Sequence, residues 1–298
     1  MKKRTLLNTL PFHMMLLAPV VLVFIFHYIP MFGVVISFQD YKPGWGFLGS
    51  PWVGFENYKM LAMMPDTLKA VRNTVFIAFM KIIGNLVVPV AFALLLNEIR
   101  QKWFKKTAQT ITYLPYFLSW VILAGIVTDF LSLNGFVNMI IKAFGGKSIF
   151  FLGNKQWFPY VMVITDVWKG FGFNTIVYLA ALTGIDETLY EASSIDGAGR
   201  WKQTWHITLP GISQFVVLMT ILSIGNILNA GFDQIFNLYN PMVYETGDII
   251  DTLVYRMGIV NQSYSLSTAV GLFKSVISLI LISTSHKMAG KYANYKVF

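Results

Sequence analysis

Six long apolar runs constrain what this chain can fold into. They lie at about residues 12–38, 73–96, 110–131, 157–182, 211–231 and 267–286 of a chain of 298 residues. Each run is close to the roughly 20 residues that a helix needs to cross a bilayer. Lipid cannot satisfy backbone polar groups, so such runs predict helices that bond internally. The sequence therefore predicts an all-α membrane protein with six transmembrane helices in one domain over residues 1–298.

The composition agrees with a membrane protein and excludes other classes. Hydrophobic residues make up 55% of the chain and charged residues 12%, whereas soluble domains carry about 25% charged residues. The formal net charge of +9 comes from short segments between the apolar runs, where topology determinants lie, so no nucleic-acid binding is expected. The chain has no cysteine, which excludes disulfides and thiolate chemistry.

The distribution of Lys and Arg predicts an orientation in the membrane. The first apolar run follows three basic residues and lacks a small-residue cleavage site, so it is expected to remain as a span. With both termini inside, the inner segments hold twelve Lys and Arg residues and the longer outer loops hold eight. The densest cluster is residues 100–106, with four cations. The positive-inside rule therefore places both termini in the cytoplasm.

The chain lacks the common catalytic signatures. It contains no phosphate-binding loop of the form G-x-x-x-x-G-K-[ST], no G-x-S-x-G and no H-E-x-x-H. The four histidines are scattered without ligand spacing, so no metal site is expected: His13, His27, His206 and His286. The sequence thus predicts neither an enzyme nor a cofactor site, and the energy for any pumping must come from another chain.

The segment between the fourth and fifth runs, residues 183–210, carries the most specific pattern. Small residues there allow close backbone approach, Gly197 and Gly199 are free to adopt positive φ, and Pro210 can open the next helix. This pattern predicts a short helix, a turn and a second helix. Composition alone fits an ordinary solvated loop equally well.

This segment resembles the EAA loop of ABC importer permeases, E-A-A-x-x-x-G followed about ten residues later by I-x-L-P. Ser193 stands where the pattern has its second alanine, and residues 207–210 match the tail. In that family the loop docks on the ATPase, so the resemblance assigns ATPase coupling to Glu191, Ala192, Ser193, Asp196, Gly197, Ala198 and Gly199.

The resemblance extends over nearly the whole chain, through segments that include residues 28–33, 52–58, 93–100 and 113–116. It points to the maltose-type carbohydrate permeases. The stretch 225–236 is similar to the branch for complex or acidic oligosaccharides, such as alginate, pectin or rhamnogalacturonan fragments. The implied setting is a bacterial cytoplasmic membrane. The implied partners are a second, different permease, two ATPase subunits that bind ATP and Mg, an extracytoplasmic sugar-binding protein and the oligosaccharide.

Polar residues inside the apolar runs are candidates for the substrate pathway, because charges at bilayer depth are costly unless they face a cavity or a partner. Amides suit sugar hydroxyls, although the same groups also serve helix packing. Asp166 and Lys169 can pair on one helical face, whereas Lys81 and Lys274 lack a local partner and need one on another helix, in water or at an interface. The candidates are Lys81, Asn85, Asp166, Lys169, Asn226, Asn229, Asp233, Gln234 and Lys274.

Two other functions are weighed against a sugar permease. A membrane-embedded enzyme needs base, nucleophile or metal spacings that the chain lacks. An ion-coupled secondary carrier predicts inverted repeats or paired broken helices, which the sequence does not show, and it leaves the segment 183–210 unexplained. If the cargo is acidic, the lysines at bilayer depth are expected to supply positive potential, with Lys81 and Lys274 as the cleanest tests and Lys169 as the least clean.

Overall fold

The computed structural model describes residues 2–292, with side chains from residue 10 to residue 291. The described part is mostly helical and contains only an isolated bridge between Gln39 and Trp52 in place of a sheet. Met1 and residues 293–298, the two ends that the orientation prediction concerns, lie outside the described residues. Contacts divide the chain into two compact units, residues 1–63 with 254–273, and residues 64–253 with 274–298. The single-domain prediction stays a prediction.

The first unit contains the N-terminal span and the loop that follows it. The span changes from α-helical to π- and 3₁₀-helical turns, and the loop is closed by Asn57, whose amide donates to the carbonyls of Ser37 and Gln39 at 2.9 and 3.0 Å. The elements are α1 Lys2–Val23, η1 Phe24–Tyr28, α2 Ile29–Met31, η2 Phe32–Phe38, α3 Gly46–Gly49, α4 Glu56–Met63 and η7 Arg256–Val260, with the start of α16 Tyr264–Tyr292.

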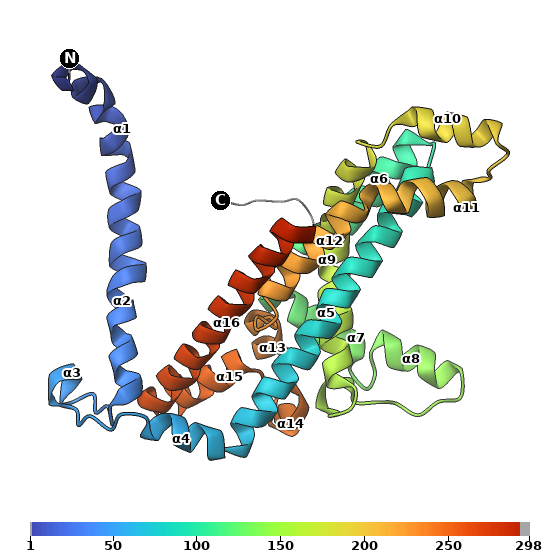
Figure 1. The fold of residues 1–298 in the computed structure, drawn as a ribbon. Helices are drawn as coiled ribbons and strands as arrows, with labels where there is room; N and C mark the ends of the chain where they lie inside the picture. Colours follow the sequence, from blue (N-terminus) through green and yellow to red (C-terminus); the bar gives the residue numbers. More distant parts are fainter. Residues whose placement is uncertain (1, 293–298) are drawn as a thin grey trace. The chain divides into compact units, whose positions relative to one another are not determined.

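The second unit is built on two long helices that lie side by side, α5 Pro65–Glu98 and α9 Phe158–Leu182 (Figure 1). The other elements of this unit are α6 Lys102–Tyr113, η3 Leu114–Phe117, α7 Trp120–Leu131, α8 Phe136–Ala143, η4 Phe151–Gly153, α10 Glu187–Ile195, α11 Arg200–Gln203, η5 Thr204–Thr208, α12 Leu209–Gly225, α13 Phe232–Leu238, η6 Pro241–Val243, α14 Tyr244–Gly247, most of α15 Ile250–Tyr255 and the rest of α16.

Among the described residues, five segments are long and apolar enough to cross a membrane: Leu10–Phe38, Pro65–Glu98, Trp120–Ala143, Arg200–Gly225 and Tyr264–Lys291. Helix α9 covers the remaining predicted span, 157–182, with 25 residues. That is enough to cross about 30 Å of hydrocarbon. Its hydropathy is lowered by Asp166, Lys169 and Asn174, and α9 is not among the five segments that qualify as spans by length and composition. The predicted all-α fold with six spans is confirmed.

Two predicted spans differ from the observed helices. The run 110–131 is broken, because Pro115 lacks a backbone N–H and cannot continue α6; the chain passes through η3 before α7 begins at Trp120. The predicted run 211–231 extends beyond the observed helix, because α12 ends at Gly225 and the chain turns before α13. Both corrections place irregular backbone beside the polar centre of α9.

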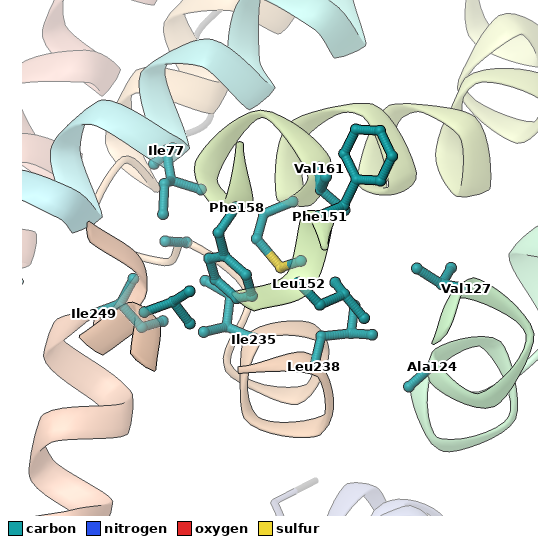
Figure 2. Packing of buried hydrophobic residues seen from close by; sticks show 14 residues of the cluster. Ile77, Ala124, Val127, Phe151, Leu152, Phe158, Val161, Ile235, Leu238 and Ile249 are labelled. Atoms are coloured by element: carbon teal, nitrogen blue, oxygen red, sulfur yellow. The ribbon is translucent and has the colours of Figure 1, made fainter. Parts of the chain in front are cut away.

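A buried hydrophobic cluster holds the second unit together at one end. Phe158 at the start of α9 is fully buried, and around it lie Ile77 of α5, Val127 of α7, Ile235 of α13 and Ile249 (Figure 2). A second cluster at the other end joins the last turns of α5 and α9 to the start of α12. The two clusters leave the middle of the unit to polar side chains.

Candidate functional site

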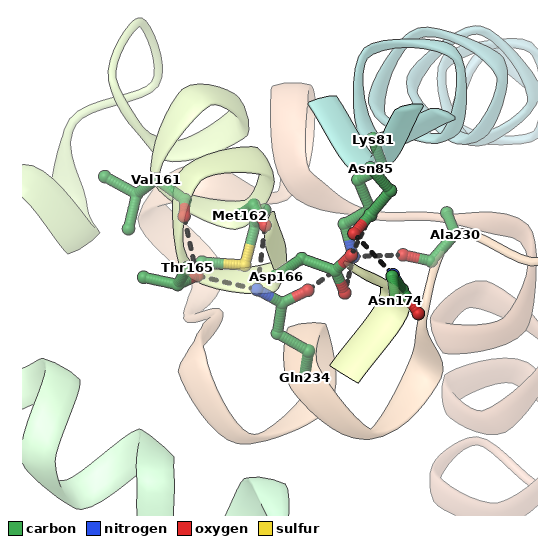
Figure 3. Close-up of polar contacts among 9 residues, drawn as sticks. All are labelled: Lys81, Asn85, Val161, Met162, Thr165, Asp166, Asn174, Ala230 and Gln234. Atoms are coloured by element: carbon green, nitrogen blue, oxygen red, sulfur yellow. Dashed lines mark hydrogen bonds and ion pairs between the residues drawn. The ribbon is translucent and has the colours of Figure 1, made fainter. Parts of the chain in front are cut away.

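A buried ammonium group lies at the centre of the second unit. The Lys81 side chain projects from α5, and the residue is only 6% exposed. Its Nζ donates to Asp166 Oδ1 at 3.1 Å, to the carbonyl of Ala230 at 2.7 Å and to Gln234 Oε1 (Figure 3). A buried charge is tolerated when its hydrogen-bonding capacity is filled and an opposite charge lies beside it. All three donor positions of this ammonium are used.

The partners of Lys81 are held by a further layer of hydrogen bonds. Gln234 is fully buried, and its amide donates to the carbonyl of Met162 at 2.8 Å and to Thr165 Oγ1 at 2.7 Å. On the other side, Asn85 donates to Asp166 Oδ2 at 3.0 Å. The network therefore joins three elements that are far apart in sequence, α5, α9 and α13.

Gly231 makes this arrangement possible. It has a φ of +93°, a conformation that glycine adopts readily and other residues rarely do. A Cβ at this position would lie 2.9 Å from Lys81 Nζ. The turn between α12 and α13 therefore brings the carbonyl of Ala230 within reach of the ammonium only because residue 231 has no side chain.

Beside the network is an open cavity of about 380 Å³. Its polar lining consists mainly of amides, and its charged groups are Lys81 and Asp166, which neutralise each other. Asn229 makes no side-chain hydrogen bond within the described residues, and Asn226 donates only to the carbonyl of Leu222 at 3.3 Å. The cavity therefore presents amide groups with unused hydrogen-bonding capacity. It is lined by Ala78, Lys81, Ile82, Asn85, Asp166, Asn174, Met219, Leu222, Ser223, Asn226, Asn229, Ala230 and Gly231.

A smaller cavity of about 140 Å³ adjoins the first and shares Asn85, Asn174, Met219 and Ser223 with it. It extends along α9 as far as Tyr178. Asn174 and Ser223 were not among the predicted pathway residues. Asn174 follows Asp166 by eight residues on α9, which places the two on one helical face, and this spacing is the signal that would have found it.

Five of the nine predicted pathway residues line the larger cavity, namely Lys81, Asn85, Asp166, Asn226 and Asn229. The others lie elsewhere. Gln234 is buried behind Lys81, Asp233 is exposed on α13 and outside the cavity lining, and Lys274 pairs with Asp251 at 2.5 Å. The predicted pair between Asp166 and Lys169 is wrong, because Asp166 faces α5 and bonds Lys81 and Asn85, whereas Lys169 faces the break between α6 and α7.

A helical hairpin lies at the opposite end of the second unit from α8 and α14 (Figure 1). Helix α10 is capped by Asp186, whose carboxylate accepts from the backbone N–H of Thr188 at 2.9 Å, and this hydrogen bond lowers the pKa of Asp186. The turn passes through Gly197 with a φ of +75°, and α11 follows. The helix, turn and helix expected from the sequence are therefore present in residues 183–210.

Side-chain hydrogen bonds hold the hairpin in shape. The amide of Gln203 donates to Ser193 Oγ and Ser194 Oγ, both at 2.9 Å, and thereby joins α11 to α10. Arg200 forms an ion pair with Glu98 at the end of α5, at 3.0 Å. The serine that replaces the second alanine of the EAA pattern thus has a structural role, because its hydroxyl also donates to the carbonyl of Tyr190.

Most of the predicted coupling residues are exposed on the hairpin: Glu191, Ala192, Asp196, Gly197 and Gly199. Ser193 and Ala198 are partly buried. Large apolar side chains also stand free, with Ile195 87% exposed and Trp201 75% exposed. Single exposed apolar residues are common, but several on one short hairpin are typical of a surface that another protein covers.

Comparison with known proteins identifies the family. Residues 86–286 match the model of the binding-protein-dependent transport system inner membrane component. The chain belongs to this family. It is therefore a permease component of an ABC importer, a multi-pass membrane protein and not an enzyme, as the sequence predicted.

Individual relatives cover almost the whole permease. It is 43% identical over 286 residues to the protein LplB of Bacillus subtilis (strain 168), a match that covers 95% of this chain and 90% of the relative. It is 40% identical over 287 residues to the polygalacturonan/rhamnogalacturonan transport system permease protein YteP of the same organism, with coverage of 96% and 89%.

Solved structures give the same result. A chain of a bacterial ABC transporter involved in the import of the acidic polysaccharide alginate superposes with a TM-score of 0.88 at 34% identity, covering 97% of this chain and 98% of that chain. A chain of the bacterial alginate ABC transporter in complex with an alginate pentasaccharide-bound periplasmic protein gives 0.89 at 34% identity, with 99% of both chains covered.

Proposed function

We propose that this permease supplies half of the translocation pathway of an ATP-driven importer for complex or acidic oligosaccharides. Its partners in this proposal are a second, different permease subunit, two cytoplasmic ATPase subunits that bind ATP and Mg, and an extracytoplasmic sugar-binding protein. Two relatives support the substrate class, one named for polygalacturonan and rhamnogalacturonan and the other described as importing alginate.

The observation that carries the proposal is one uninterrupted helical segment from the hairpin to the cavity. α11, η5 and α12 run without a break from Arg200 to Gly225, a length of about 39 Å for 26 residues. One end lies in the hairpin and the other is followed directly by Asn226, which lines the cavity. A rigid segment of this kind transmits a displacement of the hairpin by the ATPase to the sugar-binding groups.

The arrangement gives each part a role in alternating access. The exposed residues of α10 and the turn at Gly197 dock on the ATPase, and closure of the ATPase pair moves the hairpin. The movement tilts α12 and opens the cavity toward the sugar-binding protein. The amides of Asn226 and Asn229 bind sugar hydroxyls. They hold the substrate only in the conformation of the permease in which they face it. An ion-coupled carrier or an enzyme has no use for this hairpin.

Removing both amides tests the binding role. The double variant Asn226→Ala/Asn229→Ala is expected to lower ATP-dependent uptake of oligosaccharide about thirtyfold, because two hydrogen bonds of about 1 kcal/mol each are lost. The matched control is Asn237→Ala, because Asn237 is exposed, lies outside the cavity lining and bonds only the carbonyl of Asp233. Initial uptake rates measure the effect, and unchanged uptake in the double variant contradicts the proposed pathway.

The orientation belongs to the same proposal, with both termini in the cytoplasm of a bacterial cell and the hairpin on that side. Single cysteines report it cleanly, because the chain has none of its own. Lys147→Cys is expected to react with a membrane-impermeant maleimide in intact cells, and Lys106→Cys only after the membrane is opened; both positions are exposed. The opposite labelling pattern inverts the topology and removes the hairpin from the ATPase.

A further inference from the structure

Lys169 differs from the other lysines of the membrane region in the partners it has. Its Nζ donates to the carbonyl of Leu118 at 2.8 Å and approaches the carbonyl of Tyr116 at 3.4 Å. The same nitrogen lies 5.2 Å from the ring centroid of Trp120 and 6.0 Å from that of Tyr116. Among the described residues, no carboxylate lies within ion-pair distance of it.

A comparison with the two other lysines shows which of the three has no counter-charge. Lys81 is neutralised by Asp166 at 3.1 Å and Lys274 by Asp251 at 2.5 Å. All partners of Lys169 are uncharged, so it has no counter-charge among the described residues. The expectation that Lys81 and Lys274 attract acidic cargo therefore loses its physical basis. Lys169 also becomes the cleaner test, because its removal leaves Asp166 paired with Lys81 and Asn85.

The position of Lys169 indicates that its side chain faces water and not lipid. The residue is near the middle of α9, and its neighbours belong to the break between α6 and α7, with Tyr116 in the 3₁₀ turn η3 and Leu118 at its end. Irregular backbone at membrane depth is tolerated only where protein buries it or a water-filled cavity adjoins it. Tyr116 is 41% exposed, so this chain does not bury the break. An uncompensated cation facing lipid is costly as well.

Resting on the proposed function, we propose that Lys169, Tyr116 and Trp120 form a recognition point for the carboxylate of a uronic sugar in the translocation pathway. The ammonium pairs with the carboxylate, a charge-assisted contact stronger than its bonds to neutral carbonyls. The apolar face of the pyranose ring packs against the neighbouring aromatic rings. Phe173 holds Tyr116 in place, because the two rings stack with centroids 4.0 Å apart and planes within 5°.

The recognition point complements the neutral cavity. The amides beside Lys81 bind hydroxyl groups and do not distinguish an acidic sugar from a neutral one. Lys169 lies on the same helix as Asp166 but faces the break between α6 and α7 and not the cavity, so charge selection takes place at a separate point from hydroxyl binding. Specificity then arises because a neutral sugar leaves the ammonium with its weak carbonyl contacts, whereas a uronic sugar supplies the missing counter-charge.

The test compares uptake of trigalacturonate with uptake of its carboxyl-reduced, neutral counterpart in proteoliposomes that contain the full importer. Lys169→Gln is expected to lower uptake of the acidic trisaccharide at least about tenfold, a loss of about 1.4 kcal/mol, and to change uptake of the neutral one less than about twofold. Lys169→Arg keeps the charge and is expected to retain the preference for the acidic sugar. Lys147→Gln, an exposed lysine in the loop between α8 and η4 and outside the candidate spans, is the matched control and is expected to change neither rate.

The outcomes separate this inference from the proposed function. An equal loss for both sugars in Lys169→Gln, or no loss for either, overturns the inference and leaves the ATP-driven sugar permease intact. Absence of ATP-dependent uptake of both sugars by the unmodified importer overturns the proposed function and the inference with it. Tyr116→Leu supplies an independent readout, because loss of the ring is expected to lower uptake of both sugars while the acidic preference remains.

Discussion

Replacing Lys81 with methionine is expected to destabilise the permease by about 3–5 kcal/mol, because it leaves Asp166 without its counter-charge in the interior of the protein. The free energy of unfolding of a protein is often only about 5–15 kcal/mol, so a loss of this size can unfold much of the population. The Gln234 oxygen and the carbonyl of Ala230 lose the same partner. Thermal unfolding of the detergent-solubilised protein, followed by tryptophan fluorescence, measures the effect.

Three further variants sharpen this test. Lys81→Met/Asp166→Asn removes both charges and is expected to recover part of the loss, and Gly231→Ala is expected to destabilise because its Cβ would lie 2.9 Å from Lys81 Nζ. Lys155→Met breaks an ion pair with Glu245 whose side chains are 55% and 49% exposed, so water screens the pair and the expected change in melting temperature is small. Equal melting temperatures for Lys81→Met and Lys155→Met would contradict the account of the network.

Replacing Gly197 with valine is expected to reduce ATP-driven uptake to below about a tenth while membrane insertion stays normal. The residue has a φ of +75°, and space around its Cβ position is open. The effect therefore comes from backbone conformation, because the left-handed region is strongly unfavourable for a β-branched residue. Valine changes the turn and misplaces α10 relative to α11.

The control for this prediction is Gly197→Asn, because asparagine tolerates the left-handed region better than other non-glycine residues. It is expected to retain most of the uptake. Co-purification of the ATPase with each variant separates lost docking from lost transmission. Normal uptake together with normal ATPase retention in Gly197→Val would remove the coupling assignment from this hairpin.

Much of the fold follows from local sequence. The six spans were predictable because apolar length alone determines whether a helix can cross a bilayer. The hairpin was predictable because Gly197 and the small residues before it restrict the backbone locally. The break at Pro115 was missed, although proline inside an apolar run is a known signal. The end of α12 was missed because residues 226–231 remain apolar enough to continue a helix on composition.

The sequence predicted the kinds of side chain at the site but not which of them lie together. Lys81 and Asp166 were recognised as membrane charges, yet they are 85 residues apart in sequence, and only the packing of α5 against α9 makes them partners. Asp166 and Lys169 looked like a local pair because they are three residues apart on one helix. The rotation of α9 instead points them at different neighbours, and helix rotation is determined by tertiary packing.

The central claim is that this chain couples ATP hydrolysis in a partner to oligosaccharide movement through its own cavity. The most direct measurement is uptake of trigalacturonate by proteoliposomes that contain this permease, its partner permease, the ATPase and the sugar-binding protein. The account predicts uptake that requires ATP and all four components, is insensitive to proton or sodium gradients, and is lost in Gly197→Val. Uptake driven by an ion gradient through this chain without the ATPase would contradict it.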